Sequence, residues 1–198
     1  MAAAPSGMGG ADLVIGIGNP LRGDDGVGWL LLRGLRRLRG QRARQVRRGG
    51  RLAPVVRLVP QLVPELVLEM AAARRVLVVD AWCNAGPQAR PRLRRLGPAA
   101  AEPGPAAGHR LDPGALLALV ALVREDPPPA WLLLLPAYAF PYDTALSAAA
   151  RRRLPLARQL LRRWLAASPP WGPPIGRAGS LHLLSTSGRQ GGLAPRLR

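Results

Sequence analysis

The chain has 198 residues, of which 48% are hydrophobic, and its formal net charge at pH 7 is +18. This length fits one domain with a sizeable core, and the single cysteine excludes an intramolecular disulfide framework. The longest apolar runs, at 115–123 and 130–135, are shorter than the roughly 20 residues that a membrane helix needs. The N-terminus lacks the basic and apolar regions of a secretory signal, so we expect a cytoplasmic protein.

Apolar runs and helical patterns alternate along the chain, which predicts an α/β fold. We expect a three-layer sandwich, with a mostly parallel twisted sheet of about five strands and helices on both faces. A flexible N-terminus (1–11) would precede a single α/β domain (12–167), and a Pro-, Gly- and Ser-rich disordered tail (168–198) would follow it. In chain order, the expected elements are a strand at 12–17, a helix at 25–38, a strand at 54–59, a helix at 64–73, a strand at 75–81, a weak edge strand near 90–96, a helix at 114–124, a strand at 131–135 and a helix at 147–167.

Three local patterns support these boundaries. The continuous β-branched run at 75–81 is typical of a strand buried on both faces of a parallel sheet. Asp112-Pro113 is typical of a capped helix start. Pro155 would kink the last helix or mark its true start.

The loop between the first strand and the first helix is rich in glycine and reads Gly-Ile-Gly-Asn-Pro-Leu-Arg-Gly-Asp-Asp-Gly-Val-Gly (16–28). It lies at the carboxyl edge of the predicted sheet, where open α/β sheets bind ligands. Leu21 stands where a dinucleotide fingerprint needs its third glycine, and the chain has no lysine for a Walker loop. The adjacent carboxylates of Asp24 and Asp25 instead favour a cation or acid–base chemistry, although either could simply cap the following helix.

All 29 basic residues are arginines, and they crowd into 33–51 and 151–163. Such runs can bind nucleic acid or an acidic partner protein. They can also be ordinary solvated helix faces on which arginine has replaced lysine. Apart from Trp164, which directly follows the second run, the aromatic residues lie away from these runs, which does not favour base stacking and hence does not favour nucleic acid as the partner.

Two further side chains complete a candidate metal site. Asp80 ends the third predicted strand, and His109 precedes the Asp112-Pro113 helix start. With the acidic pair they form an oxygen, oxygen, nitrogen ligand set that suits nickel or zinc. Each also has a structural interpretation, since an aspartate at a strand end often caps a turn and a loop histidine often lies in solvent. We interpret Cys83, three residues past Asp80, as a buried or idle thiol with a minor metal role left open.

The glycine–aspartate loop resembles the signature of the hydrogenase maturation proteases, endopeptidases that remove a C-terminal extension from the large subunit of nickel–iron hydrogenases. The resemblance covers about residues 12–166. Further segments that resemble the family are Gln-Leu-Val-Pro-Glu-Leu (61–66), Val-Val-Asp-Ala (78–81), Gly-His-Arg-Leu-Asp-Pro (108–113) and the Leu146-Ser147 pair that opens the last helix.

The resemblance implies that Asp25, Asp80 and His109 are both the nickel ligands and the catalytic residues. The nickel would already be loaded in the hydrogenase large-subunit precursor, and it could polarise the scissile carbonyl as a Lewis acid. Asn19 and Asp24 would shape the loop. We assign no general base. We expect a monomer whose partner is this precursor, and we expect no membrane association.

Two other functions stay open at this stage. A non-catalytic, metal-dependent hydrogenase-assembly chaperone would keep the same site and bind the precursor without shortening it. An arginine-rich nucleic-acid-binding protein would lose affinity steeply with salt and would not depend on Asp25, Asp80 and His109.

Overall fold

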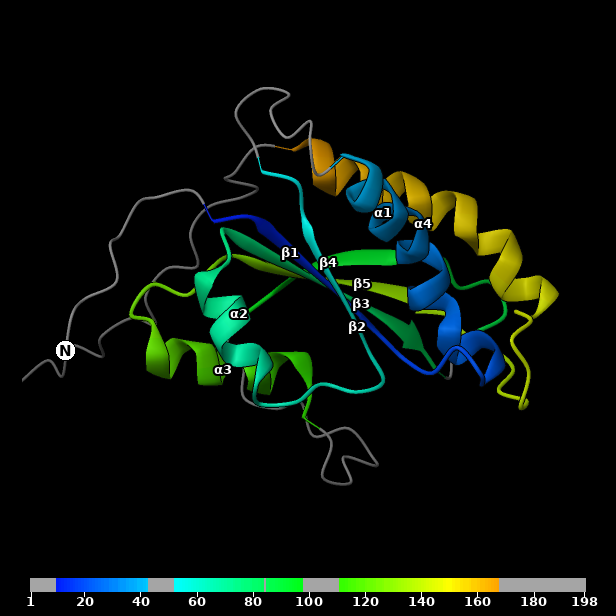
Figure 1. The fold of residues 1–198 in the computed structure, drawn as a ribbon. Helices are drawn as coiled ribbons and strands as arrows, with labels where there is room; N and C mark the ends of the chain where they lie inside the picture. The colour runs from blue at the N-terminus through cyan, green and yellow to red at the C-terminus, as the bar shows by residue number, and fades with distance from the viewer. Residues whose placement is uncertain (1–9, 43–51, 84, 98–110, 168–198) are drawn as a thin grey trace, which may run out of the picture. The chain divides into compact units, whose positions relative to one another are not determined.

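Five strands form one sheet in the order β2-β1-β3-β5-β4 (Figure 1). The computed structural model of the chain describes residues 10–42, 52–83, 85–97 and 111–167. Strands β1, β2, β3 and β5 are parallel, and β4 pairs antiparallel with β5 at one edge. The predicted sheet and its predicted edge strand are therefore confirmed. The strands are β1 (Asp12–Ile17), β2 (Val55–Val59), β3 (Arg75–Trp82), β4 (Arg92–Leu96) and β5 (Ala130–Pro136).

Helices cover both faces of this sheet, as expected for three layers (Figure 1). Helices α1 (Val27–Arg42) and α4 (Ala148–Ala166) pack on one face. Helices α2 (Leu66–Ala72) and α3 (Pro113–Val123) pack on the other. A short 3-10 turn, η1 (Gly23–Gly26), leads into α1.

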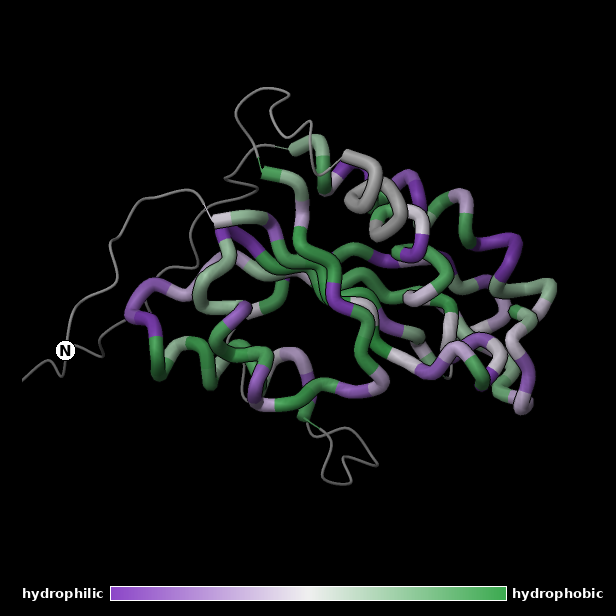
Figure 2. Tube along the Cα trace, viewed as in Figure 1, coloured by the Kyte–Doolittle hydropathy of each residue, from purple (hydrophilic) through white to green (hydrophobic). Residues whose placement is uncertain are grey.

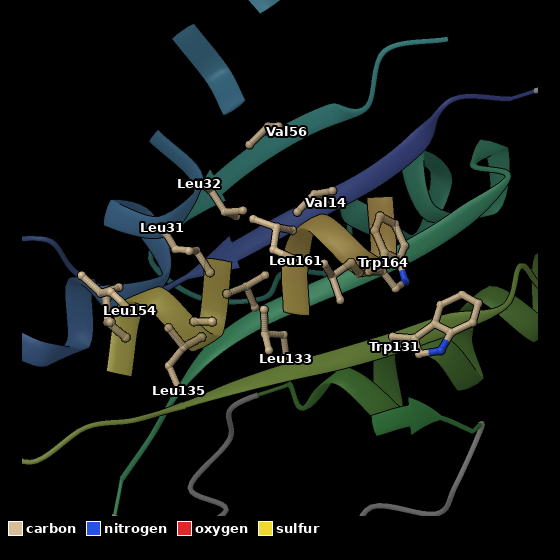
Figure 3. Close-up of a cluster of buried hydrophobic side chains, with 14 of the residues drawn as sticks. Val14, Leu31, Leu32, Val56, Trp131, Leu133, Leu135, Leu154, Leu161 and Trp164 are labelled. Atoms are coloured by element: carbon tan, nitrogen blue, oxygen red, sulfur yellow. The ribbon is translucent and has the colours of Figure 1, made fainter. Parts of the chain in front are cut away.

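The alternation of side chains along the strands creates two hydrophobic cores, because neighbouring residues point to opposite faces. On β1, Val14 faces α1 and α4, whereas Leu13 and Ile15 face α2 and α3. The first core is closed by Trp131 of β5 and Trp164 of α4, whose ring centroids lie 6.0 Å apart (Figure 3). The strands accordingly appear as a hydrophobic centre, with purple, hydrophilic stretches on α4 at one side and the mostly hydrophobic α3 at the other (Figure 2).

Three boundaries differ from the sequence-based expectations. Helix α1 begins at Val27, because Asp25 belongs to the η1 turn that precedes it. Strand β3 continues past Asp80 to Trp82, since it stays paired with β5 to that point. Helix α4 begins at Ala148 and runs through Pro155, so that proline does not mark its start.

The remaining predictions about domain boundaries fall largely on residues that are not described. The described residues belong to one compact unit, Met1–Ala167. The predicted flexible N-terminus, apart from residues 10 and 11, and the predicted tail at 168–198 lie outside the described ranges. Among the described helices, none has the length and apolar character to cross a membrane.

A cluster of charges holds the amino ends of β1 and β3 to the end of α4. Asp12 is buried and accepts hydrogen bonds from two arginines, Arg74 (Nη2 to Oδ1, 2.6 Å) and Arg75 (Nη2 to Oδ2, 2.7 Å). Arg75 is itself buried, donates to the carbonyl of Ala167 and lies 4.0 Å above the Trp164 ring. The guanidinium therefore fixes the C-terminal end of α4, where a positive charge also complements the helix dipole.

Candidate functional site

The candidate site is built on the loop that follows β1, and hydrogen bonds between residues of this loop hold its shape. The Gly18 N–H donates to the carbonyl of Val59, and a side chain at this residue (φ +123°) would collide with the Asp25 carbonyl oxygen. The Asn19 N–H donates to Oδ2 of Asp25 at 2.8 Å, and its side-chain oxygen accepts from the Leu21 N–H. Asn19 therefore shapes the loop, and glycine is required where the chain folds back against Asp25.

Asp24 points away from the exposed edge and is fully buried. Its Oδ2 accepts hydrogen bonds from the Tyr138 N–H (2.8 Å), the Ala139 N–H (3.0 Å) and the Ser147 hydroxyl (2.8 Å). Its Oδ1 accepts from the Ser147 N–H at 2.7 Å. These four donors use the capacity of the carboxylate, so Asp24 neither caps α1 nor faces a ligand.

The segment between β5 and α4 is attached to η1 by backbone contacts as well. The Gly23 N–H donates to the carbonyl of Asp143, and the Asp24 N–H donates to the carbonyl of Ala139. Gly23 has φ +51°, and a side chain there would come within 2.8 Å of the Ala139 oxygen and of Pro141. The two loops thus form one ordered unit that sets the position of Asp25.

Asp25, in the η1 turn that follows β1, and Asp80, near the end of β3, both lie at the carboxyl edge of the sheet. Both side chains are partly exposed. At Gly28, a side chain would lie 3.2 Å from the carbonyl oxygen of Val79, so the start of α1 packs closely on β3 just before Asp80. Within β3, Oδ1 of Asp80 accepts from the following N–H of Ala81 at 2.7 Å.

The negative charges of both carboxylates act on the thiol of Cys83. The residue is exposed, which corrects its interpretation as a buried thiol, although neighbouring atoms still displace part of the water around its sulfur. This partial desolvation raises the pKa of the thiol, and the negative charges of Asp80 and Asp25 raise it further. The positive charge of Arg22 acts in the opposite direction. Asp25 and Asp80 therefore both lie near enough to Cys83 for their charges to act on its thiol.

The third predicted ligand, His109, lies outside the described residues. Within the described ranges, no group of three histidine, cysteine, aspartate or glutamate residues could hold a metal ion. The described chain resumes at Leu111, just before the predicted cap of α3. That cap is confirmed, since Oδ1 of Asp112 accepts from the N–H groups of Gly114 (2.7 Å) and Ala115 (3.0 Å).

No family model and no curated protein sequence matches this chain. Solved structures do match it. The hydrogenase-maturating endopeptidase HybD from E. coli has a TM-score of 0.57 and 17% identity, covering 78% of this chain and 91% of its own. The [NiFe] hydrogenase maturation protease HycI from Thermococcus kodakarensis KOD1 has a TM-score of 0.55 and 19% identity, covering 78% and 92%.

The chain has the fold of the hydrogenase maturation proteases. HybD from Thermococcus kodakarensis gives the same result, with a TM-score of 0.53, 17% identity and coverage of 78% and 98%. The fold expected from the sequence motifs is therefore confirmed over most of the chain. In such an open α/β fold, the carboxyl edge with Asp25 and Asp80 is the edge where a ligand site is expected.

Proposed function

We propose that this protein is an endopeptidase that removes the C-terminal extension of a nickel–iron hydrogenase large-subunit precursor after nickel insertion. It would act in the cytoplasm as a monomer that forms a transient complex with the precursor. The observation that carries the proposal is the placement of Asp25, in the turn after β1, and Asp80, near the end of β3, at the ligand-binding edge of a maturation-protease fold.

The two adjacent aspartates have different roles in this proposal. Asp24 is occupied by four donors and fixes the loop, whereas Asp25, like Asp80, is partly exposed. Asp25, Asp80 and His109 would recognise the nickel carried by the precursor. Carboxylate oxygens and an imidazole nitrogen are suitable donors for divalent nickel.

The metal belongs to the substrate in this proposal. When bound, it would supply Lewis-acid polarisation of the peptide carbonyl that is cut. The protein would hold the precursor so that this carbonyl lies beside the metal. The backbone contacts of Gly18 and Asn19 keep Asp25 oriented for this task without a rearrangement of the loop.

The direct test is a cleavage assay with the full chain and a nickel-loaded large-subunit precursor from the same genome. The shortened product would be followed by gel shift for the wild type and for the Asp80→Asn and His109→Ala variants. We expect both changes to reduce processing by at least about 100-fold, because each removes a proposed metal contact. Precursor that has not received nickel should not be cut.

The matched control is Asp143→Asn, because this exposed aspartate is in the neighbouring segment and an amide oxygen can still accept from the Ala145 N–H. It should process at the wild-type rate. Thermal unfolding of all variants separates a lost contact from a lost fold. Wild-type processing by Asp80→Asn and His109→Ala would refute the site, and precursor that binds without being shortened would favour a chaperone.

A further inference from the structure

The proposed function leaves the most unusual property of the chain, its charge of +18, unused. Part of this charge is organised on one surface. We define the basic face as four exposed arginines, one in the segment after β3 and three that recur at helical spacing on α4: Arg90, Arg151, Arg158 and Arg162.

Helix α4 separates this charge cleanly from its apolar side. Its buried residues include Leu154, Leu161 and Trp164, which pack against the sheet (Figure 3). Arg151, Arg158 and Arg162 recur at helical spacing on the opposite side and extend over about 16 Å of helix. Hydrophilic residues accordingly line the outer side of α4 (Figure 2).

The described elements that carry the basic face contribute no acidic side chain to it. Neither α4 nor residues 85–97 contain an aspartate or a glutamate. The ion pairs of Arg57, Arg74 and Arg75 in the described part of the chain lie outside the basic face. Arg158 and Arg162 stand four residues apart, a spacing at which like charges destabilise a helix. The charges of this pair therefore add nothing to the stability of the helix.

The basic face also adjoins the candidate site. Arg151 lies one turn after Ser147, the residue whose N–H and hydroxyl bind Asp24. Next to it, Arg153 donates to the carbonyls of Ala89 (3.0 Å) and Pro87 (2.9 Å), which holds the Arg90 segment against α4. Arg151, at the start of α4, is therefore the part of the basic face that lies nearest along the chain to the residues around Asp24 and Asp25.

From these observations we infer that the basic face docks an acidic surface of the protein that is to be cut. The inference rests on the proposed function, under which the molecule at Asp25 is a polypeptide. Charge complementarity of this kind accelerates association and fixes orientation. A nucleic acid is less suited, since the only aromatic residue of α4 and residues 85–97 is Trp164, which is buried and offers no stacking platform.

The test compares two double variants with the same charge change. Arg158→Gln/Arg162→Gln removes two positive charges from the basic face. Leu68→Glu/Leu122→Glu adds two negative charges at exposed residues of α2 and α3, on the other side of the sheet. Both would be assayed for kcat and KM on the nickel-loaded precursor at low and high salt, with thermal unfolding as the control for folding.

We expect the arginine variant to have about a tenfold lower kcat/KM at low salt, through KM, because steering by charge is lost. The deficit should fade at high salt, and the variant should unfold at the wild-type temperature or above it. The leucine variant should match the wild type.

Three outcomes would overturn the inference. Equal kcat/KM for the arginine variant and the wild type would remove any role of the basic face in docking, and equal losses in both variants would indicate total charge alone. Loss of affinity for a fluorescent DNA duplex, with precursor cleavage unchanged, would assign the face to nucleic acid. Absence of cleavage by the wild type would instead refute the proposed function, and this inference with it.

Discussion

The two edges of the sheet both carry charged side chains, but they use them differently. At the amino edge, Asp12 and Arg75 are buried and bonded to each other, and Arg75 also binds the end of α4. At the carboxyl edge, Asp24 is buried and bonded in a similar way, whereas its neighbour Asp25 and the residue Asp80 are partly exposed. The first edge is a closed structural cluster, and the second combines a structural carboxylate with two that face solvent.

This contrast indicates how the fold can carry exposed acidic groups in fixed positions. A buried carboxylate that accepts several hydrogen bonds holds the backbone around it. The partly exposed carboxylate beside it, Asp25, then needs only the single hydrogen bond from the Asn19 N–H to stay in place. Breaking each edge separately should therefore give different combinations of lost stability and lost activity.

The largest effect is expected for Asp24→Ala. Four donors from Tyr138, Ala139 and Ser147 would lose their acceptor inside the protein. We expect a loss of about 4 kcal/mol in the free energy of unfolding, measured by urea denaturation. Processing of the precursor should fall as well, because the loop that carries Asp25 is no longer attached.

The control for this change is Asp143→Ala, which removes an exposed carboxylate from the segment that Asp24 holds. Its only described side-chain hydrogen bond is with the Ala145 N–H at 3.1 Å, so it should cost below about 1 kcal/mol. A similar loss in both variants would mean that the segment, rather than the buried carboxylate, determines stability.

At the amino edge, Arg75→Met should cost about 3 kcal/mol, because it leaves Asp12 with one arginine and removes the bond to the Ala167 carbonyl. Arg74→Met is the matched variant, since it binds the same carboxylate from a more exposed position, and it should cost below about 1 kcal/mol. Urea denaturation measures both. If Arg75→Met remained folded under the assay conditions but processed the precursor much more slowly than the wild type, the amino edge would not be purely structural.

The smallest effect concerns the reactivity of Cys83, the single cysteine of the chain. Its pKa is raised by partial desolvation and by the charges of Asp80 and Asp25, so alkylation by iodoacetamide should become rapid only at a higher pH than for a free cysteine. Asp80→Asn removes one negative charge and lowers the pKa. Alkylation at pH 8 should then be about threefold faster.

The same measurement on Asp143→Asn should give the wild-type rate, because that residue is not among the charges that act on the thiol. If Asp80→Asn left the alkylation rate unchanged, the charge of Asp80 would not act on the Cys83 thiol. The raised pKa of this thiol would then need another explanation.

Much of the fold could be predicted because its signals are local. The β-branched run that became β3 and the Asp112-Pro113 start of α3 are each contained within a few residues. The weak run near 90–96 was likewise predicted as an edge strand, and β4 is the outer strand beside β5. Periodicity and capping are sufficient for such elements.

The role of Asp24 could not be predicted in the same way. Its partners lie 114 to 123 residues away along the chain, and the adjacent Asp25 is chemically identical. The sequence therefore offered a helix cap as an equally good interpretation, and for Asp24 it was wrong. The bond between Arg75 and the end of α4 is equally distant in the chain, at 92 residues. The assignment of His109 stays a prediction.

The bond between Asp24 and Ser147 also has a consequence for the order in which the protein matures during its synthesis. Asp25 and Asp80 emerge from the ribosome early, but the donors that order the loop of Asp25 follow only after β5 has been made. Contacts of such long sequence separation form late, because the intervening chain must first be arranged. The carboxyl edge is therefore completed only once the start of α4 is available, so a partly synthesised chain would hold the acidic residues without their ordered arrangement.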